Sequence, residues 1–186
     1  MTCIVGLVSG SRVVMGADSA AVDTASLSLD LRIQPKVFRN GSFLIGYTSS
    51  FRMGQLLEHA FSPPAMRVGQ DAFAFMVAEF VPAVRRCFEV GGWARQDSGV
   101  HSGGSFLVAY AGRLFCIESD FQVAEHARGY HAIGCGDQTA LGALFVTETL
   151  STMGPVDRVM TALEAAAAGS AGVAAPFHID FLEPSA

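Results

Sequence analysis

Three residues near the start of the sequence, Thr2, Asp18 and Lys36, have side chains that together could carry out acyl transfer. Thr2 follows the first Met, and a Met before a small residue is commonly trimmed after synthesis. An N-terminal Thr carries a hydroxyl and a free α-amine on one residue, and an amine with an ordinary pKa of about 8 can accept the hydroxyl proton. Thr2 is therefore a candidate nucleophile that needs no segment before it. The alternative is an ordinary strand threonine.

Asp18 and Lys36 are candidates for tuning that amine. Asp18 ends the second strand of a predicted hairpin, beside the start of the first, so pairing in register would bring it near Thr2. Lys36 is the only lysine in the chain, against eleven arginines, and the surroundings of a lysine can lower its pKa. Held charged by Asp18, Lys36 would favour the neutral, basic form of the amine. A solvated turn aspartate and a lone surface lysine are the alternatives.

The elements that must position these residues begin with two hairpins. Apolar, β-branched runs at 2–8 and 13–17 flank a Gly- and Ser-containing turn, which is typical of a hairpin. A second hairpin is predicted over 36–47, around the turn signal Asn40-Gly41. We expect these four strands to form one sheet.

Helices are predicted to follow. The apolar spacing favours one helix over 50–60 and a long one over 69–90, which Pro82 should kink. Strands between 105 and 134 then indicate a second sheet.

The C-terminal third repeats the change from strands to helices. Asp137 can cap one helix and Pro155 suits the first turn of another, and 176–182 reads as a final strand. Two antiparallel sheets packed face to face, each flanked by a helix pair, would bury every apolar face. The predicted fold class is therefore α+β, a four-layer αββα sandwich, as a single domain over 1–186.

Composition excludes several classes of protein. The chain is 51% hydrophobic and only 16% charged, which indicates apolar contacts between subunits and hence an oligomer. The net charge is −5 and the basic residues are scattered, so nucleic acid is not an expected partner. No apolar run is long enough to span a membrane. Four widely spaced cysteines form no CxxC pair, which favours a reducing cytoplasm.

Four segments of the sequence resemble one family. "TCIVGLVSGSRVVMGADSAAV", "KVF", "GYTSS" and "IGCGD" are similar to the N-terminal-nucleophile (Ntn) hydrolases of the proteasome β-subunit and HslV peptidase type. The resemblance runs from Thr2 to about residue 150 and is most specific over 2–50. It implies a threonine peptidase with Thr2, Asp18 and Lys36 as its catalytic centre. It also implies peptide or unfolded-protein substrates, a homo-oligomeric ring that encloses the active sites, a possible ATP-dependent unfoldase partner and no cofactor.

The resemblance also implies supporting residues, with departures from the family pattern. Ser49 stands where the family has a glycine whose N–H stabilises an oxyanion; a serine keeps that N–H if its backbone conformation is tolerated. Cys135 replaces a serine that orients the amine, and a thiol is a weaker hydrogen-bonding group. Ser170 matches a supporting serine, but Ala167 replaces the aspartate that precedes it. These departures favour the alternative of a non-catalytic assembly subunit; a small-molecule amidase is the third possibility.

The candidate substrate-binding residues are Val22, Tyr47 and Phe51. Tyr47 and Phe51 would flank the pocket for a substrate side chain and suggest apolar specificity, with core packing as the alternative. His126 and His131 lie five residues apart, without a carboxylate and third ligand at recognisable metal spacing, so no metal site is predicted.

Overall fold

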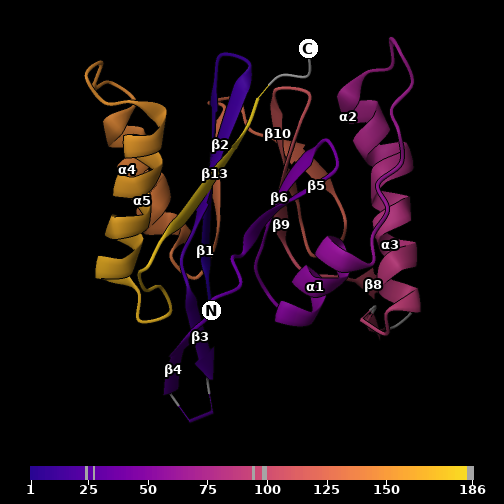
Figure 1. Cartoon of the computed structure of the whole chain (residues 1–186), viewed down its shortest axis with the longest axis horizontal. Coiled ribbons are helices and arrows are strands. Elements are labelled where there is room, and N and C mark those ends of the chain that lie inside the picture. The colour runs from indigo at the N-terminus through magenta and orange to yellow at the C-terminus, as the bar shows by residue number, and fades with distance from the viewer. Residues whose placement is uncertain (24, 27, 94, 98–99, 184–186) are drawn as a thin grey trace.

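The structure, a computed structural model, describes residues 1–23, 25–26, 28–93, 95–97 and 100–183. Its elements form four layers, in which two antiparallel sheets lie face to face between two groups of helices (Figure 1). The predicted α+β, αββα sandwich is thus confirmed.

Each sheet combines strands from both halves of the chain. The first has the order β12-β1-β2-β13, with these bounds: β1 Cys3–Ser9, β2 Arg12–Ala17, β12 Tyr130–Gly134, β13 His178–Leu182. The second has the order β11-β10-β9-β6-β5, with these bounds: β5 Val37–Asn40, β6 Phe43–Tyr47, β9 Phe106–Tyr110, β10 Arg113–Ile117, β11 Val123–Glu125. The expectation that the two N-terminal hairpins share a sheet is wrong. The strands of both hairpins carry buried residues on both faces. The two hairpins therefore lie in different sheets that pack face to face.

Two short hairpins lie outside these sheets. Their strands are β3 Ala20–Asp23, β4 Ser28–Leu31, β7 Arg95–Asp97 and β8 Val100–Ser102. The β3–β4 hairpin projects from one end of the sandwich (Figure 1).

The helices cover the outer faces of the sheets. α4 (Asp137–Thr147) and α5 (Pro155–Gly169) pack on β1 and β2, at the left in Figure 1. On the other side lie α1 Phe51–His59, α2 Ala72–Phe75, the π-helix η1 Met76–Phe80 and α3 Val81–Val90. None of the helices in the described part of the chain has the length and apolar character that a membrane span requires.

The predicted long helix is interrupted where Pro82 requires it. Pro82 lies in the first turn of α3, directly after η1. A proline cannot donate to the carbonyl four residues earlier and its ring clashes with that group, so the wider π turn accommodates it.

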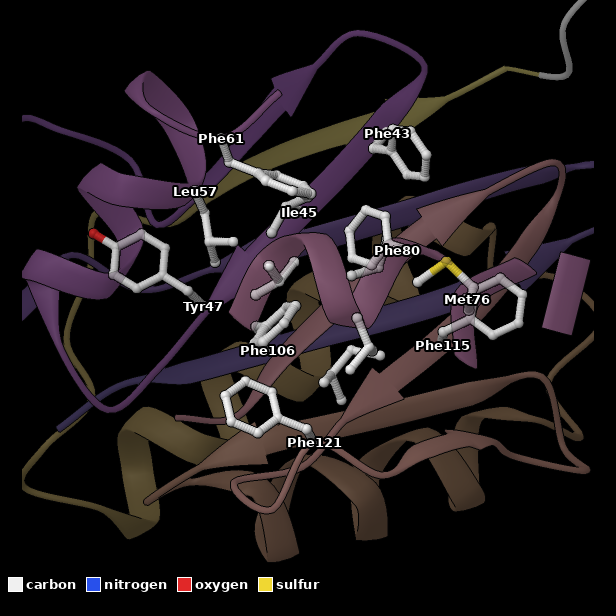
Figure 2. Packing of buried hydrophobic residues seen from close by; sticks show 14 of the residues in the cluster. Phe43, Ile45, Tyr47, Leu57, Phe61, Met76, Phe80, Phe106, Phe115 and Phe121 are labelled. Atoms are coloured by element: carbon white, nitrogen blue, oxygen red, sulfur yellow. The ribbon is translucent and has the colours of Figure 1, made fainter. Parts of the chain in front are cut away.

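Three apolar cores hold the layers together. One lies between the sheets and includes Ile4, Met15 and Leu44, all fully buried. A second lies under α1 and α3 and is rich in aromatic rings (Figure 2). There Phe80 packs between Phe43 and Phe61, with ring centroids 5.0 and 5.3 Å away. The third lies under α4 and α5. Each sheet is thus packed on both of its faces. The candidate site lies at the end of the sandwich where β1 begins.

Candidate active site

Asp18 is fixed at the start of β1 by the pairing of the first hairpin. Ile4 pairs with Ala17 in this antiparallel hairpin. Cys3, which precedes Ile4, therefore lies opposite Asp18, which follows Ala17. The N–H of Cys3 donates to Asp18 Oδ1 at 2.9 Å, and the N–H of Asp18 donates to the Cys3 carbonyl at 3.3 Å. The predicted closeness of Asp18 to the Thr2 end of β1 is therefore present.

Lys36 lies fully buried beside Asp18. Its Nζ donates to Asp18 Oδ1 at 2.9 Å and to the carbonyl of Ala20 at 2.6 Å, and both charged side chains are 0% exposed. The interpretations of a surface lysine and a solvated aspartate are thus wrong. Burial lowers the pKa of Lys36, and the Asp18 carboxylate opposes that shift. An ammonium carries three N–H donors, and two of those of Lys36 are accounted for by Asp18 and Ala20.

The Asp18 carboxylate is saturated by donors. Oδ2 accepts the N–H of Ala20 at 2.8 Å and that of Ala174 at 3.3 Å, in addition to the two bonds on Oδ1. Hydrogen bonds of this kind stabilise a buried carboxylate and fix its orientation. Ala20 and Ala174 contribute only backbone groups, so no side-chain pattern in the sequence could have identified them.

Thr2 is held from the other side by the segment after β12. The N–H of Cys135 donates to the Thr2 carbonyl at 2.8 Å. Gly134 has a φ of 105°, and a Cβ there would lie 2.9 Å from the Thr2 carbonyl carbon and still closer to its oxygen. Only glycine permits this approach, which explains the first glycine of "IGCGD".

Ser49 takes the left-handed conformation that was in question. Its φ is 67°, in the region that favours glycine. The Ser49 hydroxyl accepts the Ser105 N–H at 3.2 Å and lies 3.2 Å from Thr48 Oγ1, and these bonds compensate for the conformation. Among the described residues the Ser49 N–H donates to no group, whereas the Ser50 N–H donates to the Thr48 carbonyl at 2.7 Å. Ser49 is thus the free donor of the pair.

Thr2 and Ser49 line one small cavity of about 30 Å³. Its other lining residues are Met1, Tyr47, Thr48, Ser50 and Phe51. That volume suits a group the size of a water or a carbonyl oxygen. Thr2 and Ser49 therefore line one space, and the buried Lys36–Asp18 pair contacts Cys3, the residue that follows Thr2.

Comparisons with known proteins bear on the fold of the chain. Neither a protein-family model nor a characterised protein sequence matches the chain. Among solved structures, Thiobacillus denitrificans BPH in complex with epoxomicin has a TM-score of 0.83 at 18% identity over 100% of both chains. Eukaryotic HslV from Trypanosoma brucei has a TM-score of 0.69 at 19% identity, covering 98% of this chain and 99% of that one. Anbu from Hyphomicrobium sp. strain MC1, a Gly-1 mutant, has a TM-score of 0.67 at 15% identity, covering 96% and 80%.

The chain has the proteasome-like Ntn-hydrolase fold. The predicted resemblance is therefore confirmed as a structural match across the full chain.

In this Ntn-hydrolase fold Met1 still precedes Thr2, the candidate nucleophile. Thr2 Oγ1 donates to the Met1 carbonyl at 2.5 Å, and Thr2 itself is 6% exposed. The Met1 side chain lies over Gly172, where a Cβ would be 2.5 Å from Met1 Cβ. With Met1 in place the Thr2 nitrogen is an amide, so the site would gain its base only when Met1 is removed.

Cys135 and Ser170 both reach the Thr2 side of the fold. Cys135 Sγ lies 3.5 Å from the Thr2 carbonyl oxygen and 3.5 Å from Ser170 Oγ. Ser170 Oγ also accepts the N–H of Gly172 at 3.3 Å. The two supporting candidates thus form one chain of contacts that ends at Thr2.

The candidate substrate-binding residues divide into two kinds. Tyr47 is 5% exposed and belongs to the core under α1, as the packing alternative proposed, yet it also lines the small cavity. Phe51 lies next to Tyr47 with ring centroids 6.4 Å apart, and 6.0 Å from Lys36 Nζ. Val22 is half-buried on β3 opposite Leu29. It lines neither the small cavity nor the larger pocket described next.

A larger pocket of about 490 Å³ adjoins the cavity across Tyr47 and Phe51. It is lined by Arg32, Gln34, Tyr47, Phe51, Arg52, Gln55, Leu56, Glu58, His59 and Ala60. The guanidinium of Arg32 lies over the Phe51 ring, 4.6 Å from its centroid. Polar and charged side chains surround the two aromatic rings in this lining.

Cys3, next to Thr2 in the sequence, is unsuited to be a nucleophile. Its side chain is fully buried in the core under α4 and α5. Burial raises the pKa of Cys3 to about 12, with Asp18 adding to the shift, so the thiol stays protonated at neutral pH.

Proposed function

We propose that the chain is a threonine peptidase of the proteasome and HslV type, acting through Thr2 after removal of Met1. The observation that carries this proposal is the fully buried Lys36–Asp18 ion pair beside the first residues of β1. Burying two charges costs free energy that apolar residues would not cost, so such a pair beside a nucleophile favours a functional role.

The proposed reaction uses Thr2, with the amine freed by removal of Met1, and the backbone of Ser49. Thr2 Oγ attacks the carbonyl carbon of the substrate, and the hydroxyl proton passes to the Thr2 amine. The carbonyl oxygen becomes an oxyanion that accepts the free N–H of Ser49. The ammonium of Thr2 then protonates the leaving amine, which gives an ester on Thr2. Water hydrolyses the ester and restores the hydroxyl.

Lys36 supplies the electrostatic control. In its charged form Lys36 disfavours a second ammonium nearby, which keeps the Thr2 amine neutral and able to accept a proton. Asp18 raises the pKa of Lys36 and so opposes the lowering caused by burial. Asp18 also holds the backbone of β1 through Cys3, so one carboxylate sets both the charge and the position of the nucleophile.

A homo-oligomeric ring is part of the proposal. Exposed apolar side chains on and after the β3–β4 hairpin support subunit contacts: Leu29 is 53% exposed, Leu31 50% and Ile33 94%. Peptides or unfolded proteins are the proposed substrates, with an ATP-dependent unfoldase as a partner of the ring. The cytoplasm suits a chain whose four cysteines are unpaired.

The first experiment combines intact-mass measurement with labelling by epoxomicin. The expected result is a mass lacking Met1, followed by the addition of one epoxomicin. Thr2→Ala should abolish labelling and peptide hydrolysis, and Thr2→Ser, which keeps both hydroxyl and amine, should retain labelling. Equal labelling of Thr2→Ala and the unchanged protein would contradict the assignment.

A non-catalytic assembly subunit is the second candidate. The bond from Thr2 Oγ1 to the Met1 carbonyl and the packing of Met1 over Gly172 favour it, because both stabilise a retained Met1. A mass that includes Met1, together with no labelling, would establish this alternative. A small-molecule amidase differs from both in size: analytical ultracentrifugation would show a monomer or dimer instead of a ring.

A further inference from the structure

Two histidines outside the candidate active site stack on each other in the structure. His126 follows β11 and His131 lies on β12, and their rings are 3.6 Å apart between centroids with planes 12° from parallel. Both residues are half-buried. His126 Nε2 is buried and makes no hydrogen bond within the described part of the chain. An unsatisfied buried nitrogen is costly, at about 1–3 kcal/mol, so this arrangement calls for a partner.

Cys116 completes the group from β10, in the sheet that faces the strand carrying His131. Along β10 its neighbours Phe115 and Ile117 pack under the helices, whereas Cys116 points into the core between the sheets. On β12, Tyr130 and Ala132 face the helices, so His131 points toward the same inter-sheet layer by strand alternation. The ligand atoms of Cys116, His126 and His131 all lie within 4.8 Å of one another.

Glu118 adds a carboxylate beside this group. The Cys116 thiol donates to Glu118 Oε1 at 3.2 Å, and Glu118 is half-buried two residues after Cys116. Sulfur, two imidazoles and a carboxylate form a donor set typical of Zn²⁺, and unlike the all-oxygen sets of Mg²⁺ or Ca²⁺. We propose that Cys116, His126 and His131 bind one Zn²⁺ between the two sheets, with Glu118 or a water as the fourth ligand.

The geometry requires only local adjustment. Ligand bonds of about 2.0–2.3 Å set the ligand atoms of a tetrahedral zinc site roughly 3.3–3.7 Å apart, so rotations that close the group by about 1 Å suffice. The imidazoles would unstack as each ring turns a nitrogen toward the ion. β11 and β12 are edge strands of the two sheets, so the ion would join the sheets at that edge of the sandwich.

Zinc binding requires neutral imidazoles and a thiol that gives up its proton. Each imidazole would bind zinc through the unprotonated nitrogen of its neutral ring. Burial raises the pKa of the Cys116 thiol, and Glu118 adds to this. Zinc binding therefore forms a Zn–S bond and displaces the thiol proton, which leaves to solvent.

The test is titration of the full-length protein, freed of any affinity tag, with Zn²⁺ alone and with Co²⁺ alone. We expect one equivalent to bind with a Kd below about 1 μM. We also expect Zn²⁺ to raise Tm by about 5 °C and to release a proton measured in weak buffer. Co²⁺ should give a thiolate-to-cobalt charge-transfer band, and Mg²⁺ should have no effect.

Variants separate this site from adventitious binding. Cys116→Ser should abolish the charge-transfer band, and His126→Asn should weaken Zn²⁺ binding at least about tenfold. Cys87→Ser and His178→Asn replace a cysteine and a histidine elsewhere and should bind like the unchanged protein. If Cys116→Ser does not fold, His126→Asn, at a half-buried edge position, decides the question. The absence of stoichiometric binding, or equal binding by site variants and controls, would overturn the proposal. Thr2→Ala should bind Zn²⁺ normally, so this result is independent of peptidase activity.

Discussion

Lys36 Nζ lies 2.9 Å from Asp18 Oδ1, with both side chains completely buried. The same oxygen accepts the backbone N–H of Cys3, the residue after the candidate nucleophile. Charge and strand position at Thr2 therefore depend on one carboxylate.

Removing either partner of this pair should destabilise the protein strongly. Lys36→Met or Asp18→Ala leaves a buried charge without its partner, which should lower the free energy of unfolding by about 3–5 kcal/mol. The double variant should lose less than the sum of the two, because neither charge is then left alone. Urea unfolding of the three variants measures this coupling. Arg39→Met, in the exposed Arg39–Asp180 pair, is the control and should cost at most about 1 kcal/mol. Additive losses at Lys36 and Asp18 would show that the pair is not coupled.

Ser49→Gly should keep most activity. Glycine takes the φ of 67° without strain and retains the N–H proposed to bind the oxyanion, while the bond from Ser105 to the Ser49 hydroxyl is lost. These effects oppose each other, so we expect stability within about 1 kcal/mol of the original and epoxomicin labelling within about threefold. Ser49→Val, a β-branched residue in the left-handed region, should cost about 1–3 kcal/mol. A large loss of labelling in Ser49→Gly alone would transfer the role from the backbone to the hydroxyl.

Gly134→Ala tests the contact that holds Thr2 from behind. The added Cβ would press on the Thr2 carbonyl in a backbone with φ of 105°, so the start of β1 must move. We expect loss of at least about 2 kcal/mol and of most epoxomicin labelling. Gly41→Ala is the matched control: its φ is 58° and its Cβ would meet nothing within 4 Å, so only about 1–2 kcal/mol of backbone strain should appear. Equal effects at both positions would mean that the contact with Thr2 is unimportant.

Sequence reasoning predicted the layers and the catalytic candidates, but not which of the two sheets each hairpin joins. Periodicity and turn residues locate strands such as those around Asn40-Gly41, because these signals are local. Burial of the strands on both faces decides which sheet each hairpin joins. The order of residues in the sequence does not give that burial. Asp18 was found because hairpin pairing follows from sequence order. The meeting of Cys116 with His126 and His131 was missed because it depends on strands of two different sheets lying face to face.

Stability should fall at alkaline pH through Cys3. Burial raises the pKa of this thiol from 9.0 to about 12, so between these values the unfolded chain loses a proton that the folded chain keeps. The stabilising contribution is complete below pH 9 and is lost as pH rises toward about 12, by up to about 4 kcal/mol. Cys3→Ser does not titrate in this range, so its plot of unfolding free energy against pH should be flatter by about one proton. Identical slopes for the two proteins in urea titrations from pH 8.5 to 11 would contradict this.

Cys135→Ser should make the Thr2 site more active. Cys135 Sγ lies 3.5 Å from both the Thr2 carbonyl and Ser170 Oγ, and a thiol holds such partners only weakly. A hydroxyl forms stronger hydrogen bonds and should orient the Thr2 backbone, and with it the amine, more firmly. We expect the rate of epoxomicin labelling to rise about two- to tenfold, with Met1 removal unchanged by intact mass. Cys135→Ala, which lacks any hydrogen-bonding group, should label more slowly than the unchanged protein. A serine variant no faster than the alanine variant would show that this position does not orient the nucleophile.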